Sequence, residues 1–139
     1  MPLPKFAIKT SPIRRGLTGL ETWFWCDAPT TESVTVSIRG YRVRARARAN
    51  EFTWITDDGH SYASNTCGEE PDPEGRGLEA SARHTFETKD HYDLQLHVTW
   101  NGSYTFSGHG RSSSGDLGGV TTTSTRSYPV WEVRAVLVD

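Results

Sequence analysis

The most regular hydrophobic pattern of the chain lies within residues 91–100. Every second position is apolar there, and the apolar residues are Tyr92, Leu94, Leu96, Val98 and Trp100. Because successive side chains of a strand point to opposite faces, this spacing predicts a strand that buries one face and exposes the other. We expect the rest of the fold to be organised around this strand.

Two further alternating segments lie on either side of Gly40. In residues 33–39 the apolar positions share one face: Val34, Val36 and Ile38. In residues 41–49 valine and alanine alternate with arginine, so four arginines share the opposite face: Arg42, Arg44, Arg46 and Arg48. Neighbours on one strand face are about 6.7 Å apart. The sequence therefore predicts a row of four positive charges, called the arginine row below.

The other strand-prone segments are shorter. Residues 22–26 are bulky on both faces, and we expect a strand that is covered on both sides. A further strand is expected to begin with residues 52–55 and to end at the turn formed by residues 57–60. Residues 120–127 are rich in threonine and are also strand-prone.

The ends and the connections have their own patterns. Residues 130–138 alternate, which predicts a last strand with four inward side chains: Trp131, Val133, Ala135 and Leu137. Residues 63–77 and 108–119 are rich in glycine with proline, acid or serine, and we expect loops there. Residues 1–16 are expected to be an extended leading segment before a single domain over residues 17–139.

A hairpin turn is expected directly after the central strand, at Asn101 and Gly102. A two-residue loop would place Tyr104 and Phe106 on the polar face of the hairpin. A three-residue loop pairs Val98 with Tyr104 and so keeps apolar side chains opposite one another. We therefore predict the three-residue loop.

The composition is that of an all-β protein. The chain holds 5 Trp, 5 Tyr and 5 Phe, while 13 Gly and 7 Pro interrupt any helical period. We count seven to nine short strands. Because the apolar faces of half-buried strands must cover one another, two antiparallel sheets are expected to pack face to face. The predicted fold is an antiparallel β-sandwich.

The chain has two cysteines, Cys26 and Cys67. They are too far apart in sequence for a CxxC redox or zinc pair. We predict a disulfide between them, which would restrict the unfolded chain by about 4 kcal/mol and would require an oxidising compartment. The alternative is two unpaired, buried thiols.

The net charge of −2 gives no reason to expect nucleic acid as a partner, because nucleic-acid-binding domains usually carry a basic footprint. The unusual charge feature is the arginine row. One interpretation is a solvated face whose guanidiniums pair with Glu132, Asp93 or Glu51, and each such exposed pair adds little stability. The other is a ridge that binds an anionic partner, such as a phosphate-bearing wall polymer, a lipid headgroup or an acidic protein.

Clustered carboxylates suggest a calcium hypothesis, because hard cations bind several oxygens; they are Asp57, Asp58, Glu69, Glu70, Asp72 and Glu74. The DxDxDG spacing of a calcium loop is missing, so a solvated acidic loop is the preferred interpretation. His91, Asp93 and His97 share a strand face, but His97 lies about 20 Å from His91 along an extended strand. Solvent-facing histidines and no metal site are expected there.

Catalytic motifs are missing from the sequence. No GxSxG motif places a nucleophilic serine, and serines 112–114 lie in a glycine-rich segment where preorganisation would be poor. The same segment lacks the Gly-Lys-Ser/Thr ending of a phosphate-binding loop. We therefore expect a protein that is not an enzyme and has no cofactor.

A family resemblance is carried by three segments: Trp54-Ile55-Thr56-Asp57-Asp58-Gly59, His84-Thr85-Phe86 and Tyr92-Asp93-Leu94-Gln95-Leu96-His97-Val98. Together they resemble the PKD domain, whose pattern is W-D-F-G-D-G, then H-T-Y, then G-x-Y-x-V-x-L-x-V. The chain departs from this pattern at Ile55, Thr56, Asp57 and Asp90. The resemblance covers about residues 33–100, and it implies an immunoglobulin-like β-sandwich.

Two more segments resemble PKD-like extracytoplasmic proteins of GC-rich Gram-positive bacteria. They are the Gly-Leu-Thr-Gly-Leu-x-Thr-Trp-Phe-Trp stretch at residues 16–25 and the Ser-Tyr-Pro-Val stretch at residues 127–130. The resemblance implies a non-catalytic spacer or adhesion module at the cell surface, with protein or polysaccharide partners. The sequence has no apolar run of about 20 residues, and we expect export and anchoring segments to lie outside it.

Three functions are therefore expected in order. The first is a non-catalytic extracytoplasmic binding or spacer module that contacts proteins or the cell envelope. The second is a carbohydrate-binding module that stacks sugar rings on exposed tryptophans, with Trp23 and Trp25 as the candidate platform and Trp100 and Trp131 as further candidates. The third is binding of an anionic polymer by the arginine row.

Overall fold

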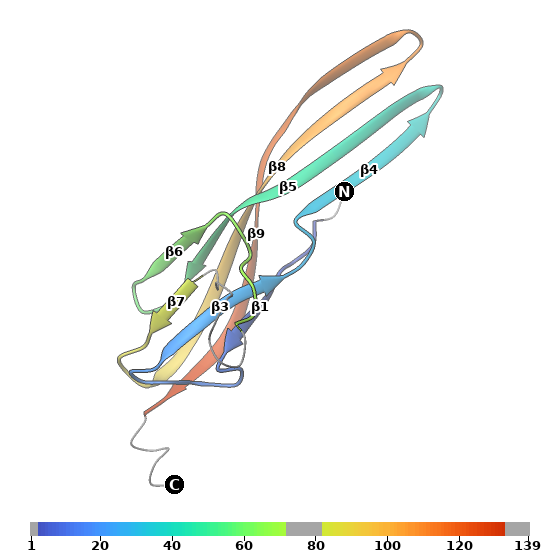
Figure 1. Ribbon diagram of the computed structural model, residues 1–139. Coiled ribbons are helices and arrows are strands. Elements are labelled where there is room, and N and C mark those ends of the chain that lie inside the picture. The colour runs from blue at the N-terminus through green and yellow to red at the C-terminus, as the bar shows by residue number, and fades with distance from the viewer. Residues whose placement is uncertain (1–2, 72–81, 133–139) are drawn as a thin grey trace.

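The structure is a computed structural model that describes residues 3–71 and 82–132, and this part of the chain is all-β without a helix (Figure 1). Nine strands occur in the described residues. Their bounds are β1 (Ala7–Ser11), β2 (Gly16–Leu17), β3 (Glu21–Asp27), β4 (Thr31–Ile38), β5 (Tyr41–Ile55), β6 (Ser61–Ser64), β7 (Ala82–Thr85), β8 (Asp90–Gly108) and β9 (Arg111–Trp131). The all-β prediction is confirmed.

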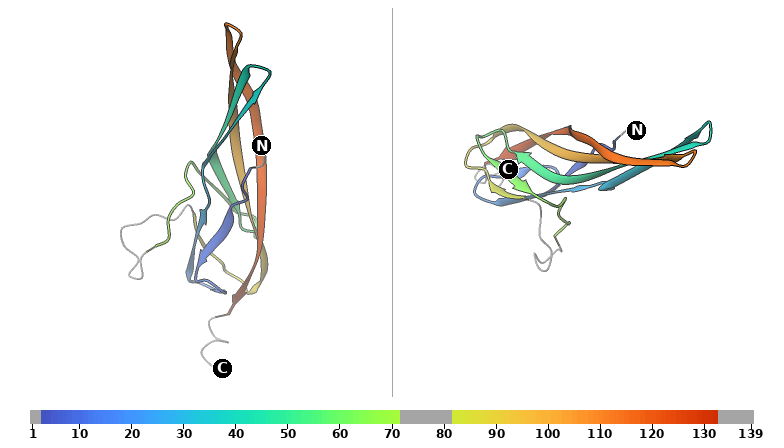
Figure 2. Two further views of the ribbon diagram at one scale, coloured as in Figure 1. Left: turned by 90° about the vertical axis from the view of Figure 1, so that its right-hand side faces the viewer. Right: turned by 90° about the horizontal axis from the view of Figure 1, so that it is seen from above.

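The strands form two sheets. Sheet A has three antiparallel strands in the order β1-β3-β7, and sheet B has the order β2-β9-β8-β5-β4, with β6 paired to one end of β5. The pairing is antiparallel throughout except between β2 and β9, so sheet B is mixed. Sheet B is strongly curled (Figure 2), as expected of strands this long, because the right-handed twist accumulates along them.

Two regions follow from the unequal lengths of the sheets. Sheet A covers only one end of sheet B, and the β4–β5 and β8–β9 hairpins continue well beyond it (Figure 1). We call residues 31–48 and 101–120 the arm, and the other described residues the body.

The central strand of the sequence analysis is confirmed as the centre of the body. All five of its predicted inward side chains are buried: Tyr92, Leu94, Leu96, Val98 and Trp100. Phe6 of the N-terminal segment packs over them, with ring centroids 5.7 Å from Trp100 and 5.5 Å from Phe52. Burying a side chain of this size is worth about 1.5–3 kcal/mol, so this layer accounts for much of the stability of the body.

A bulge at Asn50 joins two segments that the sequence suggested were separate strands. The register of β5 against β8 shifts between Ala49 and Glu51. Odd-numbered residues of β5 face the core before the bulge, and Phe52 and Trp54 face it afterwards. One extra residue changes the parity of the strand, so both apolar runs stay on the same face.

The turn predicted at Asn101 and Gly102 is wrong. Strand β8 continues to Gly108, and Asn101 pairs with Arg48 on one side and Gly119 on the other. The apolar alternation continues unbroken through residue 102, which is what a straight strand requires. A Cβ at Gly102 would lie 3.2 Å from the Cβ of Leu117, so this glycine allows a close contact rather than a turn.

The loop predicted for residues 108–119 is also wrong, because the turn is confined to its start. His109 and Gly110 have positive φ angles of 50° and 75°, and β9 begins at Arg111. Small residues in β9 leave room for the neighbouring strand: a Cβ at Gly115 would lie 2.8 Å from the ring of Tyr104. Glycine therefore belongs to a strand here, although on its own it weakens a strand interior.

The two ends of the chain differ from expectation in different ways. The segment before residue 17 contributes β1 to sheet A, and Phe6 and Ile8 lie in the core. Trp131 is 41% exposed, so its predicted inward position is wrong. The other inward positions of the predicted last strand lie within residues 133–138, outside the described part of the chain.

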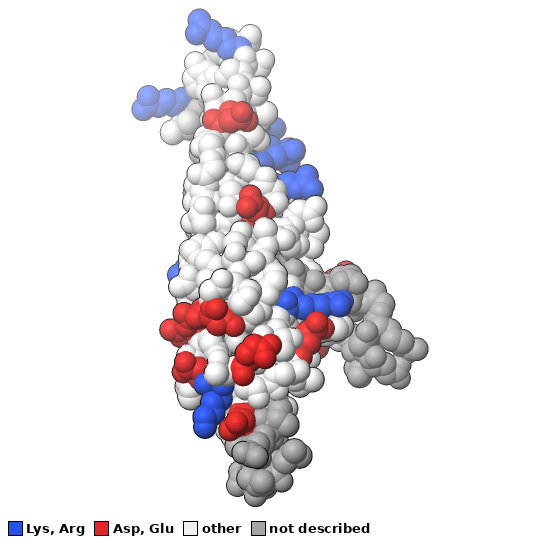
Figure 3. Space-filling model, turned by 90° about the vertical axis from the view of Figure 1, so that its left-hand side faces the viewer, with Lys and Arg blue, Asp and Glu red and all other residues white. Residues whose placement is uncertain are grey.

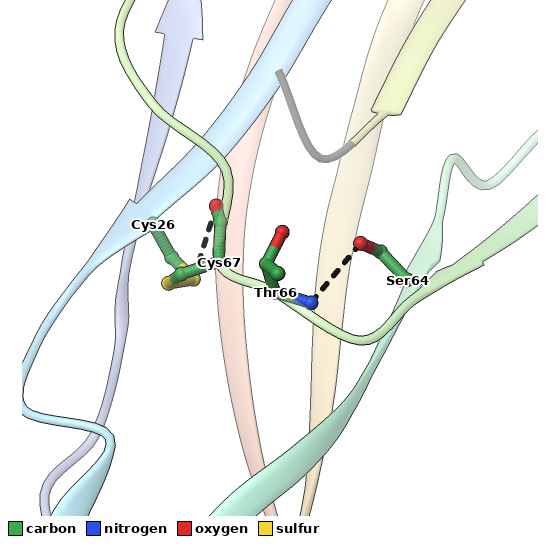
Figure 4. Close-up of a disulfide and its surroundings, with 4 residues drawn as sticks. All are labelled: Cys26, Ser64, Thr66 and Cys67. Atoms are coloured by element: carbon green, nitrogen blue, oxygen red, sulfur yellow. Dashed lines mark hydrogen bonds between the residues drawn. A yellow bond between two sulfur atoms is a disulfide. The ribbon is translucent and has the colours of Figure 1, made fainter. Parts of the chain in front are cut away.

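The predicted disulfide is confirmed. Cys26 in β3 and Cys67 in the segment after β6 are joined, with their Cα atoms 5.1 Å apart (Figure 4). The backbone N–H of Cys26 also donates to the carbonyl of Cys67 at 3.0 Å, and the backbone N–H of Thr66 donates to the Oγ of Ser64 at 3.2 Å. The disulfide thus attaches the segment after β6 to sheet A, and disulfides of this kind form in oxidising compartments.

Candidate functional site

The first candidate surface is the apolar face of the arm. In register across the strands, Val36 pairs with Val43 and Val43 with Phe106, while Ala45 pairs with Tyr104 in the next row. Sheet A ends before this region, so the face is exposed: Val36 is 51% exposed, Ile38 60%, Leu117 55% and Val120 53%. These residues continue the core face of sheet B, yet no other layer among the described residues covers them.

The tip of the arm holds its two hairpins together. The rings of Tyr41 and Phe106 stack with centroids 5.0 Å apart, and Tyr41 also contacts His109 edge-on at 4.5 Å. The Nε2 of His109 lies 2.9 Å from the carbonyl oxygen of Arg39 in the other turn. These contacts add to the pairing of β5 with β8, which places the apolar residues of both hairpins on one face.

The second candidate surface is the arginine row on the opposite face of the arm. Each of Arg42, Arg44, Arg46 and Arg48 is exposed. The residues paired with them across the strands are hydroxyl or amide side chains: Ser37 and Ser107, Thr35 and Thr105, Ser33 and Ser103, Thr31 and Asn101. No carboxylate therefore stands directly opposite a guanidinium on the neighbouring strands.

The ion pairs that we considered for the arginine row do not form. Glu132 lies 3.9 Å from the Nζ of Lys89 instead. Within residues 3–71 and 82–132, no carboxylate oxygen lies within 4.0 Å of a guanidinium nitrogen of the row. A hollow of about 460 Å³ lies beside it, lined by Arg44, Arg46, Arg48, Glu32, Asn101 and Ser103 among others.

Charge is distributed unequally between the two regions. The described part of the arm carries six arginines and two carboxylates, a net charge of +4. The described part of the body carries seven Lys or Arg and eleven Asp or Glu, a net charge of −4. On the face shown in Figure 3, most of the basic side chains lie toward the arm and most of the acidic ones toward the body. The modest total charge of the chain conceals this separation.

The tryptophans are placed differently from a sugar-binding platform. Trp25 is 9% exposed, and the half-buried Trp23 has the guanidinium of Arg83 4.4 Å from its ring centroid. Trp100 is fully inside the core, and the exposed ring of Trp131 carries the guanidinium of Arg15 at 3.7 Å. Trp23 and Trp25 therefore do not form a pair of open rings.

The structure also brings together a polar cluster that the sequence analysis missed. Asp58 and His60 belong to the turn after β5, and His84 lies in β7, so the cluster joins sheet B to sheet A. The Oδ2 of Asp58 lies 2.6 Å from the Nε2 of His84, and the Nδ1 of His84 lies 2.6 Å from the hydroxyl of Tyr62. The Nδ1 of His60 is 3.5 Å from the Oδ1 of Asp58.

The turn that carries Asp58 is fixed by several interactions. Asp57 and Gly59 adopt positive φ angles of 71° and 92°, and the Oδ2 of Asp57 accepts a hydrogen bond from the backbone N–H of Asp93 at 2.9 Å. The hydroxyl of Thr56 lies 2.5 Å from the Oδ1 of Asp58 and donates to it. The predicted turn at residues 57–60 is confirmed, and it presents the Asp58 carboxylate to β7.

The electrostatics of the cluster favour an ionised carboxylate. Burial raises the pKa of Asp58, but hydrogen bonds from Thr56 and His84 lower it by more, so the pKa lies below its ordinary value. Burial, together with the nearby Asp58 carboxylate, raises the pKa of Tyr62. The cluster therefore pairs an anionic oxygen with an imidazole and a protonated phenol.

Among the described residues, the other side chains considered as metal ligands from the sequence do not form a similar cluster. His91 is exposed, and the Nε2 of His97 lies 3.0 Å from the side-chain oxygen of Gln95. Glu69 and Glu70 are exposed, while Asp72 and Glu74 lie outside the described residues. The signal that could have revealed the cluster was the pair of matches to the PKD pattern at Asp58 and His84, which we used only for the fold.

Comparison of the chain with protein-family models, with curated proteins and with solved structures gave no match. A search of the described residues for a helix of the length and hydrophobicity that a membrane crossing needs found none.

Proposed function

We propose that this chain is a non-catalytic extracytoplasmic binding module whose arm carries the contact surface for a protein partner. The observation that carries the proposal is the exposed apolar face of the arm. Contiguous exposed apolar patches on soluble proteins usually mark interaction sites. Here the patch continues the core face of sheet B, and so it has the geometry that packs against another sheet or helix.

A protein fits this face better than a sugar does. The exposed residues are mainly aliphatic, such as Val36, Ile38 and Leu117, whereas sugar rings stack on open aromatic faces. The candidate platform at Trp23 and Trp25 is largely covered. The carbohydrate-binding module remains the alternative, and it is tested by incubating the immobilised protein with wall glycans.

The PKD-like, immunoglobulin-like identity of the body belongs to the same proposal. Its support is the position of the motif residues, because Asp58 of the W-x-x-x-D-G turn contacts His84 of the H-T-F segment. A spacer or adhesion module at the cell surface also agrees with the disulfide, which needs an oxidising environment.

The test compares two double variants of β4 that differ only in the face they change. Val36→Gln with Ile38→Gln makes the apolar face polar, and Thr35→Gln with Ser37→Gln changes the opposite face of the same strand. Immobilised, oxidised protein is incubated with envelope proteins and, separately, with wall glycans of the source cell. We expect the wild-type protein and the Thr35/Ser37 variant to retain the same envelope protein and the Val36/Ile38 variant to lose it.

Two outcomes would contradict this function. One is retention that is equal for both double variants, and the other is loss only in the Thr35/Ser37 variant. Circular dichroism of each variant shows whether the body is folded, so that a lost contact is separated from a lost fold. Sedimentation of the wild-type protein alone shows whether the partner is instead a second copy of the chain.

A second candidate function is favoured by the arginine row. Four guanidiniums on one face, with no ion-pair partner among residues 3–71 and 82–132, form a ready site for repeated anionic groups, because arginine binds phosphate and carboxylate through paired hydrogen bonds. Retention on a polyphosphate matrix should then fall steeply with salt. It should disappear when Arg42, Arg44, Arg46 and Arg48 become glutamine, and retention unchanged by those substitutions would reject this function.

A further inference from the structure

We propose that Asp58, His60 and His84 bind a divalent transition-metal ion of the Zn²⁺ class. The site is separate from both faces of the arm, so it is independent of the proposed function. It lies where the turn after β5 meets β7, and it joins the two sheets of the body.

The three side chains supply a donor set that suits a transition metal. One carboxylate and two imidazoles contribute one ligand atom each, and these three atoms all lie within 4.8 Å of one another. Two histidines and one carboxylate are a common set of protein ligands for Zn²⁺, with bonds of about 2.0–2.2 Å and a fourth position left to water. Calcium and magnesium prefer oxygen ligands, so this set favours a transition metal.

The three side chains can reach a shared ion with small movements. Tetrahedral ligands of Zn²⁺ are about 3.3 Å apart given those bond lengths, while Asp58 and His84 now approach to 2.6 Å in a direct hydrogen bond. The ion would take the place of the proton between them and separate them slightly. His60 has a side chain that is 61% exposed and is already 3.5 Å from Asp58, so it can rotate into position.

The surroundings supply the support that bound ligands need. A metal-bound histidine usually donates its other ring N–H to a fixed acceptor, which holds the ring in place. The Nδ1 of His84 already lies 2.6 Å from the Tyr62 hydroxyl, and its ring packs edge-on against Phe86 with centroids 4.7 Å apart. Thr56 holds the Asp58 carboxylate from the other side.

The accessibility of the three ligands gives the ion an entry route. The side chain of His84 is 5% exposed and that of Asp58 is 22% exposed, whereas His60 stands in solvent. An ion can therefore approach from the side of His60 while His84 forms the floor of the site. Once bound, it would clamp sheet A to sheet B, because binding to the folded state alone adds to stability.

Isothermal titration with ZnCl₂ tests the site in oxidised protein that has been stripped of metal with EDTA and dialysed. We expect one ion per chain, and we expect His60→Ala to weaken binding by at least about tenfold, because even the loss of a residue that only supports a ligand typically costs that much. His60 is exposed, so His60→Ala should keep the metal-free melting temperature. His91→Ala removes another exposed histidine and serves as the matched control, with wild-type affinity.

A second variant separates ligation from a purely structural hydrogen-bond network. Tyr62→Phe keeps the ring but removes the hydroxyl that supports His84, and it should lower Zn²⁺ affinity by about tenfold. Zn²⁺ should raise the melting temperature of the wild-type protein but not that of His60→Ala. The proposal is overturned if the wild-type protein takes up no Zn²⁺ at about 100 µM, if His60→Ala binds as well as wild type, or if His91→Ala abolishes binding.

Discussion

The body and the arm share strands β5, β8 and β9, but the apolar face of these strands is buried in the body and partly exposed in the arm. Strand β8 runs through both, and its inward side chains change from fully buried at Leu96 and Val98 to partly exposed at Tyr104 and Phe106. The alternation of apolar and polar residues is equally regular in the two parts. Alternation therefore establishes that a sheet has an apolar face, whereas the length of the opposing sheet decides whether that face is covered.

The side chains reflect this difference. The body uses large aromatic residues, such as Trp54 stacked on Phe24 at 5.8 Å, which fill the space between two sheets. The arm has a single sheet, and its aromatic residues Tyr41, Tyr104 and Phe106 are only partly buried, among smaller side chains such as alanine, valine, serine and glycine. An apolar face that no other described residue covers suits a partner, while a filled interior suits stability.

Removing the disulfide of the body is expected to cause the largest loss of stability. Replacing Cys26 and Cys67 by alanine should lower the free energy of unfolding by about 4 kcal/mol, because the loop they close is long. Urea unfolding of the variant and wild type measures this loss. Intact mass with and without reductant checks the bond itself, which should account for two hydrogens; an unchanged mass would contradict it.

A matched pair of truncations separates the two regions directly. Leu96→Ala opens a cavity in the body and should cost about 3 kcal/mol. Val36→Ala removes apolar atoms from the uncovered face of the arm and should change stability by no more than about 0.5 kcal/mol. Equal losses in urea unfolding would mean that the arm face is covered in the free protein.

The pH dependence of stability should also belong to the body. Burial raises the pKa of Tyr128, and the nearby positive charge of Arg126 only partly offsets this. Its hydroxyl donates to the carbonyl of Pro12 at 2.8 Å. A raised folded-state pKa gives stability that is complete below the unfolded value of about 10 and is lost as the pH rises through the folded value.

Tyr128→Phe should therefore flatten the alkaline decline. The variant loses one hydrogen bond, about 1 kcal/mol at neutral pH, but its stability should fall less than that of wild type between pH 9 and 11. Melting temperatures over this range are the measurement. A parallel decline in both proteins would show that Tyr128 does not contribute to it.

The smallest effect is expected within the arm. Gly115→Ala places a Cβ against the ring of Tyr104 and should tilt that ring. Because Tyr104 lies on a partly exposed face, we expect a stability change below about 1 kcal/mol but a changed environment for Tyr104. An aromatic NMR shift of Tyr104 without a change in the Tyr92 signals would localise the effect, and a shift in both would contradict the separation of arm from body.

The sequence predicted the face of each strand better than the connections between strands. The inward side chains of the central strand, beginning with Tyr92, and the arginine row, beginning with Arg42, were predicted correctly. Alternation between the two faces of a strand can be recognised from neighbouring positions alone. The turn at Asn101 was wrong because glycine supports a turn and a close strand contact equally well, and only the neighbouring Leu117 distinguishes them. The cluster of Asp58 and His84 was missed because Asp58 lies in the turn after β5 of sheet B, whereas His84 lies in β7 of sheet A. What covers a face is likewise a long-range property, so the bare arm could not be foreseen.

The arm is proposed to contact its partner through the face that carries Val36. The most direct measurement places a photo-crosslinking phenylalanine analogue at Val36 in one variant and at Thr35 in another, which are neighbours on opposite faces of β4. After illumination with envelope proteins, we expect a covalent adduct from position 36 and little or none from position 35. Equal adducts from both positions, or an adduct from position 35 alone, would contradict it.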